Sequence, residues 1–362
     1  MTPTSHRRAR TRHLRALGLL GALALSLTAA CSSQTPEPPE PVTAAPVITP
    51  DKQPVPTPSL PATWPLTGVA AGGDLVERPS LAVKVENTSA ARPQSGLEQA
   101  DVVWETVVEF QVSRFIAVYH SQVPETVGPI RSVRPMDPLV LAPTKGMLAF
   151  SGGQGGIVAL ARQSGLQILS NDDGVDGMYR SSDRAAPHNV YGDMETLWGL
   201  ADSAHQASPG EQFLFARTAK DATAVVAGSP ASLLSFRLSS ASNPSWAWDD
   251  KTGTWLRSEG SSPATARSGT RLSAVNVVSV VANHPNTSFP AQGGARVPTY
   301  DLVGQGDATI ATGGKTIAVT WKKDAQDAPL RLFLPDGSDA LLAPGNTWVE
   351  LVPRGSGSLS TS

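Results

Sequence analysis

The chain of 362 residues has a single cysteine, which excludes an internal disulfide and any metal site built from several cysteines. Charged residues are also few, at 17% of the chain, and the formal net charge is −2. The first 30 residues hold five arginines and no acidic residue, so the remainder has 24 basic and 31 acidic side chains. Sequence-independent binding to nucleic acid needs a basic surface, so the acidic remainder argues against a nucleic-acid partner. Hydrophobic residues, at 40%, suffice for a packed core.

Long hydrophobic runs are absent as well. The most apolar stretch, 17–30, follows a basic start at residues 6–15 and is shorter than the roughly 20 residues of a transmembrane helix. A basic start, a short apolar stretch and small residues predict a secretory signal peptide over residues 1–30. The string Leu27-Thr28-Ala29-Ala30-Cys31 resembles a bacterial lipobox, although Thr28 stands where leucine is preferred.

The lipobox resemblance implies cleavage before Cys31 and lipidation of its thiol. Several acyl chains give durable attachment, so the expected location is extracytoplasmic, anchored by lipid to the bacterial cell membrane. The alternative is that Cys31 is an ordinary residue in an uncleaved anchor.

Residues 31–63 contain ten prolines and no glycine. Such a segment cannot bury enough apolar surface to offset its ordering entropy, so we expect an extended, stiff tether. At the other end, residues 354–362 are rich in serine and glycine and are expected to form a flexible tail.

Between these segments the sequence changes character once. Residues 64–225 mix strand patterns, as at 81–86 and 101–110, with a helix expected over 193–204 and capped by Asp193. Residues 226–353 carry short strand-like runs separated by turn strings. The predicted fold class is α+β, with a mixed α/β N-terminal domain (64–225) and a smaller, mostly-β C-terminal domain (226–353).

Common catalytic and metal signatures fail on inspection. The string Gly314-Lys315-Thr316 suggests a phosphate-binding loop, but Thr309 stands where the earlier glycine is required. Residues 171–177 are acidic enough to suggest calcium, but Val175 occupies a position that needs an oxygen ligand. We therefore expect no metal and no cofactor.

Three polar strings are more specific: 91–97 (ARPQSGL), 128–135 (GPIRSVRP) and 186–191 (APHNVY). Through them the chain resembles the YerB-like lipoprotein family, which is defined by a domain of unknown function (number 3048). The resemblance spans residues 65–353. It implies a surface lipoprotein with two domains, and it supplies no established activity.

The same strings contribute arginines to a part of the chain whose net charge is negative. A guanidinium group can form two parallel hydrogen bonds with a carboxylate or a phosphate. We expect a pocket for an anionic envelope ligand, such as a wall-polymer phosphate, a peptidoglycan carboxylate or a lipid headgroup. The candidate ligand-binding residues are Asn87, Arg92, Gln94, Arg114, Arg131, Arg134, His188 and Asn189. The alternative is that the arginines pair internally with Glu86, Asp101, Glu105 and Glu109. If 131–134 is extended, Arg131 and Arg134 point to opposite faces and only one belongs to the site.

Three functions remain open at this point. The first is a non-catalytic binding or accessory module for the anionic ligand. The second is an envelope hydrolase or transferase that uses His188 with Glu86 or Glu105 for acid–base chemistry. The third is a scaffold for a membrane protein partner. A histidine–glutamate pair in an open cleft would favour the enzyme, arginines without that pair the binding module, and fully paired, buried arginines the scaffold.

Overall fold

The computed structural model describes residues 61–73 and 75–362. The expected signal peptide, Cys31 and most of the tether therefore lie outside the described residues. Within the described part, none of the helices has the length and apolar character needed to cross a bilayer. The α+β fold class is confirmed, with a mixed α/β sheet in the N-terminal region and antiparallel sheet in the C-terminal region.

The N-terminal region is built on five sheet strands whose residues are mostly buried, as in a sheet covered on both faces. β1 runs antiparallel to β3 and parallel to β5, and β5 runs parallel to β6. Helix α2 connects β5 to β6, as parallel neighbours require. The elements are β1 (Leu81–Glu86), β2 (Val102–Val107), β3 (Ser113–Tyr119), α1 (Met136–Leu141), β5 (Met147–Phe150), α2 (Gly155–Arg162) and β6 (Gln167–Ser170).

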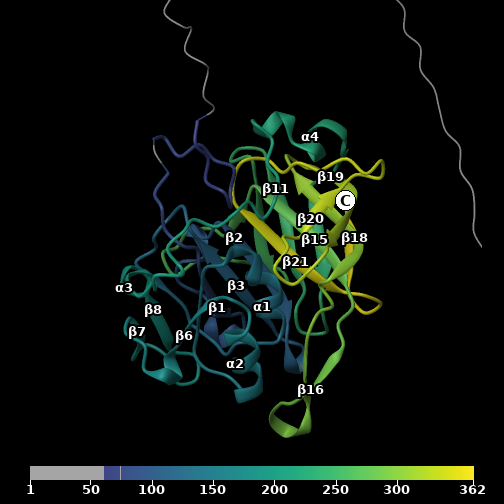
Figure 1. The fold of residues 1–362 in the computed structure, drawn as a ribbon. Helices are drawn as coiled ribbons and strands as arrows, with labels where there is room; N and C mark the ends of the chain where they lie inside the picture. Colours follow the sequence, from purple (N-terminus) through teal and green to yellow (C-terminus); the bar gives the residue numbers. More distant parts are fainter. Residues whose placement is uncertain (1–60, 74) are drawn as a thin grey trace, which may run out of the picture. The chain divides into compact units, whose positions relative to one another are not determined.

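Part of the C-terminal region extends this sheet. β21 pairs in parallel with β2 on one side and with β15 on the other, which gives the order β20-β19-β18-β15-β21-β2-β3-β1-β5-β6 (Figure 1). The added strands are β15 (Asn276–Ala282), β18 (Gly304–Thr312), β19 (Lys315–Lys323), β20 (Arg331–Phe333) and β21 (Thr347–Pro353), with β9 (Ser229–Pro230) beside β19.

A second, antiparallel sheet contains the very end of the chain. Its strands are β10 (Leu233–Arg237), β11 (Pro244–Asp249), β12 (Thr254–Glu259), β13 (Ser262–Pro263), β14 (Ser273–Ala274) and β22 (Ser358–Thr361). The expectation of a flexible tail at 354–362 is wrong, because β22 pairs with β10 and Leu359 packs against the core.

The remaining elements are short strands and helices. They are a three-stranded sheet of β4 (Thr126–Val127), β7 (Met178–Arg180) and β8 (Val190–Asp193), a hairpin of β16 (Asn286–Pro290) and β17 (Arg296–Pro298), and helices α3 (Met194–Gly199) and α4 (Thr223–Ala227). Asp193 caps α3 as predicted, because its carboxylate accepts the Thr196 amide, but α3 ends five residues earlier than expected.

The alternating pattern predicts a strand over residues 101–110, but β2 already ends at Val107. The chain then turns through η3 (Glu109–Gln111), where Phe110 and Gln111 adopt φ values of 62° and 60°. This turn directs the Glu109 side chain inward and leaves Phe110 59% exposed.

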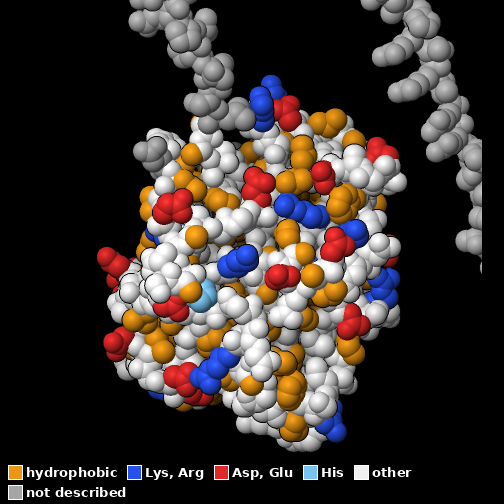
Figure 2. All heavy atoms as spheres, viewed as in Figure 1, with side chains coloured by type: hydrophobic (Ala, Val, Ile, Leu, Met, Phe, Trp, Pro, Cys, Tyr) orange, Lys and Arg blue, Asp and Glu red, His pale blue; other side chains and the backbone are white. Residues whose placement is uncertain are grey.

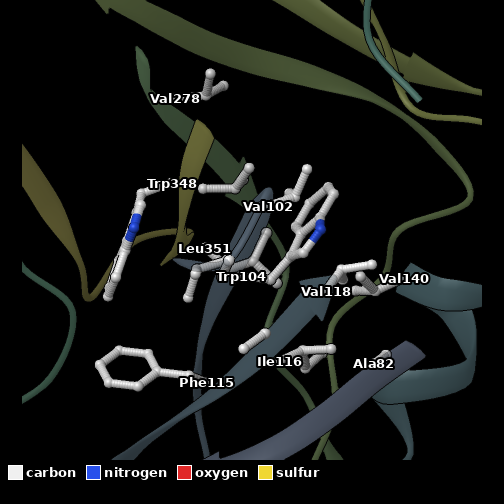
Figure 3. Close-up of a cluster of buried hydrophobic side chains, with 14 of the residues drawn as sticks. Ala82, Val102, Trp104, Phe115, Ile116, Val118, Val140, Val278, Trp348 and Leu351 are labelled. Carbon is white, nitrogen blue, oxygen red and sulfur yellow. The ribbon is translucent and has the colours of Figure 1, made fainter. Parts of the chain in front are cut away.

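The core is continuous across the two regions. Phe115 of β3 and Trp348 of β21 meet edge to face with ring centroids 5.1 Å apart, and Trp104 lies in the same apolar cluster (Figure 3). Burial of such large aromatic side chains contributes strongly to stability, so the two regions depend on each other for their core.

Candidate functional site

A pocket of about 570 Å³ brings together four of the eight predicted ligand-binding residues, and we call it the arginine pocket. It lies where the N-terminal region meets the β16–β17 hairpin. Its lining residues are Glu86, Thr88, Glu109, Phe110, Val112, Arg114, Arg131, Ser132, Arg134, Gly153, Gln154, Ile157, Pro187, His188, Pro290, Ala291, Gln292 and Val297.

The sheet topology explains why these residues meet. β1 and β5 are parallel, so their carboxyl ends share one edge of the sheet, where α/β proteins commonly bind ligands. Glu86 ends β1 and lies directly opposite Arg114 of β3, so both side chains point to the same face. Helix α2 follows β5 and presents its first turn, at Gln154 and Ile157, to the same pocket.

Arg131 and Arg134 reach the pocket from the segment between β4 and α1. The Arg131 amide donates to the Lys84 carbonyl at 2.8 Å, and the Ser151 amide donates to the Arg131 carbonyl at 3.0 Å. Arg131 is therefore held between the ends of β1 and β5. Residues 131–134 form no strand and lead straight into α1, so both arginines line the pocket, contrary to the expectation for an extended segment.

Two of the guanidinium groups share one carboxylate. Arg134 binds Glu109 through two nitrogens, with Nε 2.7 Å from Oε2 and Nη2 bonded to Oε1. Arg114 Nη2 lies 3.5 Å from the same Oε1, while its Nη1 donates to the Ser132 carbonyl at 3.0 Å. Burial lowers the pKa of Arg114 to about 10 and that of Arg134 to about 10, and the negative charge of Asp137 opposes the shift only in part.

Below the arginines, Lys84 and Asp137 form a fully buried ion pair with Nζ and Oδ1 2.7 Å apart. Burial lowers the pKa of Lys84 to about 8 in spite of Asp137, and the positive charges of Arg114 and Arg134 act in the same direction. Burial is therefore the main cause of the shift, and the neighbouring arginines add to it.

Glu86 is the centre of a second set of contacts. Both of its oxygens lie 2.9 Å from His188 Nδ1, and Thr88 Oγ1 donates to Oε1 at 2.9 Å. Arg131 Nε lies 3.4 Å from Oε2. The Glu86 side chain is 1% exposed, whereas that of His188 is 28% exposed and faces the pocket. A histidine–glutamate pair thus stands beside the arginines in an open cleft.

The structure places four predicted ligand-binding residues outside the arginine pocket. Gln94 donates to the Glu86 carbonyl and to the Asn87 side chain, and both are buried. Arg92 donates to the Asn87 carbonyl and lines a different pocket of about 250 Å³ with Gln94. Asn189 accepts from Arg180 at 2.8 Å and donates to the Ser181 carbonyl. These contacts fix loops around the site.

Glu105 is also separate from His188, which corrects its assignment as an alternative acid–base partner. It is fully buried on β2, with Oε2 2.6 Å from Arg257 Nη2 of β12. Arg257 also contacts Glu259 and Glu350, at 2.7 Å and 2.8 Å. Burial, reinforced by the charge of Glu105, raises the pKa of Glu350 well above its usual value. This cluster joins strands of both regions and has no opening to the arginine pocket.

Sequence reasoning missed Arg257 and the hairpin wall. Pro290, Ala291 and Val297 carry no chemical signature, and they reach the site because the hairpin contacts the start of α2 and the η3 turn. Gln154 Nε2 donates to the Pro290 carbonyl at 3.4 Å, and Gly156 leaves room for the Phe289 ring. Among the described residues, no group of three or more histidine, cysteine or acidic side chains could hold a metal ion.

Two family models match the chain. The N-terminal domain described as "Protein of unknown function (DUF3048)" matches residues 66–207, and the C-terminal domain of the same description matches residues 234–349. The chain belongs to the DUF3048 family. This confirms the resemblance that the polar strings indicated, and the arginine pocket takes residues from both DUF3048 domains.

One DUF3048 relative is the protein named "Putative lipoprotein YerB" of Bacillus subtilis (strain 168). It is 29% identical over 299 residues, which cover 80% of this chain and 86% of the relative. The crystal structure of YerB protein from Bacillus subtilis is similar with a TM-score of 0.69 and 27% identity, over 83% of this chain and 100% of that one.

Proposed function

We propose that this DUF3048 protein is anchored by lipid to the outer face of the cell membrane and binds an anionic envelope ligand in the arginine pocket. The named lipoprotein relative and the signal-like segment ending at Cys31 support the location. The main support for anion binding is the charge of the pocket lining. Arg114, Arg131 and Arg134 line a single pocket whose acidic lining residues are Glu86 and Glu109.

The surroundings of the arginines add to this positive excess. The first turn of α2 lines the pocket, and the N-terminus of a helix favours anions through its free amides and its dipole. Acidic and basic side chains are interspersed over the molecular face in Figure 2, so three arginines around one cavity are a distinct local feature. Phosphate and carboxylate are the groups that such guanidinium sets bind best.

The scaffold hypothesis fits less well. It expects every arginine to be buried and internally paired, whereas the Arg131 side chain is 21% exposed and its contacts with Glu86 Oε2 and with the Pro187 carbonyl are both long, at 3.4 Å. Arg131 is therefore the guanidinium most available to a ligand.

The binding is tested by sedimenting the full-length chain with purified cell-wall material at increasing salt. We expect salt-sensitive binding that phosphate displaces better than chloride at equal ionic strength. Arg131→Gln should weaken binding about tenfold or more, because a hydrogen bond to a charged group contributes about 1.5–3 kcal/mol.

Arg162→Gln is the matched control, because it removes the same charge from an exposed ion pair with Asp173 outside the pocket. It should bind like the unmodified chain. Equal losses in the two variants, or no binding by the unmodified chain, would contradict the proposal.

A further inference from the structure

Within the described part of the chain, two histidines contact a carboxylate through Nδ1, and they differ in the contacts of their other ring nitrogen. His205 Nδ1 lies 2.8 Å from Asp202 Oδ1, and its Nε2 lies 3.1 Å from the Gly165 carbonyl. Both ring nitrogens of His205 therefore contact other parts of the protein. His188 Nδ1 contacts Glu86, but its Nε2 has no hydrogen-bond partner among residues 61–73 and 75–362. A histidine that only fixes a loop has no need of this arrangement.

The contacts of Glu86 define the tautomer of His188. Thr88 donates to Glu86, and the Arg131 guanidinium lies close to it, so the Glu86 side chain acts as an ionised acceptor. An ionised carboxylate can only accept, so Nδ1 of His188 carries hydrogen. The neutral imidazole therefore presents an unprotonated Nε2 to the pocket, which is the form that takes a proton from a substrate or from water.

The groups around His188 suit a reaction at phosphorus. Arg131 and Arg114 line the same cavity, and Gly153 and Gln154 bring the start of α2 to it. Guanidinium groups and helix N-termini stabilise the negative charge that grows on phosphoryl oxygens as the reaction proceeds. Because Arg114 is almost fully buried, its charge is weakly screened by water.

Part of the pocket lining is apolar. Phe110, Ile157, Pro290 and Val297 form this part, and the half-exposed Phe110 ring stands on the η3 turn. A ligand that fills the whole cavity would place a charged group on the arginines and a carbon-rich group on this part of the lining. A phosphate ester has both parts.

We infer that the arginine pocket hydrolyses a phosphate ester, with His188 Nε2 as general base and Glu86 as the positioning residue that orients it. This inference rests on the proposed binding function. A water molecule loses a proton to Nε2 while its oxygen forms a bond to phosphorus. The phosphorus–oxygen bond to the alcohol breaks, the electron pair stays on the alcohol oxygen, and that oxygen takes a proton from solvent. His188 then releases its proton to solvent.

The test uses the full-length chain with two chromogenic probes, p-nitrophenyl phosphate and bis(p-nitrophenyl) phosphate, and calorimetry with inorganic phosphate. We expect hydrolysis of at least one probe, and the preferred probe distinguishes a monoester from a diester. His188→Gln should lower kcat about 10²- to 10⁴-fold, the usual contribution of a general base, with phosphate affinity nearly unchanged. His205→Gln is the matched control and should leave kcat unchanged.

Glu86→Gln tests the positioning role with a readout that a structural role would not move. Without the carboxylate that accepts from Nδ1, the imidazole is no longer held in the tautomer that presents an unprotonated Nε2, so kcat should fall. KM should change little.

The outcomes separate the two proposals. Phosphate binding without hydrolysis of either probe would overturn this inference and leave the binding function standing. Hydrolysis that survives His188→Gln would also overturn it. Absence of phosphate binding by the unmodified chain would overturn both.

Discussion

His120 is a buried side chain whose surroundings favour its neutral form. It packs edge to face against Trp64 with ring centroids 5.0 Å apart, and neither of its ring nitrogens has a partner within the described residues. Burial, assisted by the positive charge of Arg78, lowers the pKa of His120 to about 4. The folded chain therefore binds fewer protons at this site than the unfolded chain between about pH 4 and pH 6.5.

The consequence for stability has a definite sign. The free energy of unfolding that His120 contributes should fall as the pH drops from about 6.5 to about 4. His120→Phe should remove this part of the acid sensitivity, so the variant gains stability relative to the unmodified chain as the pH falls. Urea unfolding at pH 7.5 and pH 4.5 measures the effect, and a constant difference between the two proteins at both pH values would contradict it.

At the same scale, the sequence could predict which residue types form the site but not which members of each type. Glu86 and Glu105 both lie on buried strands, and only Glu86 reaches the pocket because it ends its strand at the carboxyl edge. Glu105 lies inside its strand and meets Arg257, a residue 152 positions away. Contacts at such separation depend on strand pairing that no local pattern records.

At the scale of elements, the misplaced boundaries have physical causes. Alternation at 101–110 indicates a strand, yet the chain turns after Val107 because Phe110 and Gln111 adopt left-handed backbone geometry, which is uncommon for these residue types. The composition of β22 does not favour a strand, and this segment is extended because it pairs with β10. By contrast, the strand at 81–86 and the cap at Asp193 depend on local signals and were predictable.

At the scale of the whole molecule, the two DUF3048 domains are successive in sequence but share one sheet. β21 of the second domain pairs with β2 of the first, and the Arg257 cluster connects both. A fragment of residues 61–228 would leave the β2 edge unpaired and part of the aromatic core exposed.

We therefore expect this fragment to lack a cooperative thermal transition when it is produced alone. Its near-ultraviolet circular dichroism should recover when residues 229–362 are produced with it. A cooperative, native-like transition of the isolated fragment would show that the shared sheet is dispensable.

The arginine pocket is proposed to hold a phosphoryl group on Arg114 and Arg131, with His188 beside it as the base. Anomalous diffraction from crystals of the full-length chain soaked in tungstate, a phosphate mimic with a strong signal, tests this claim most directly. We expect a peak inside the arginine pocket, with oxygens of the anion bound to the Arg131 guanidinium, and loss of that peak in Arg131→Gln. Peaks confined to exposed arginines such as Arg162, with the pocket empty, would contradict it.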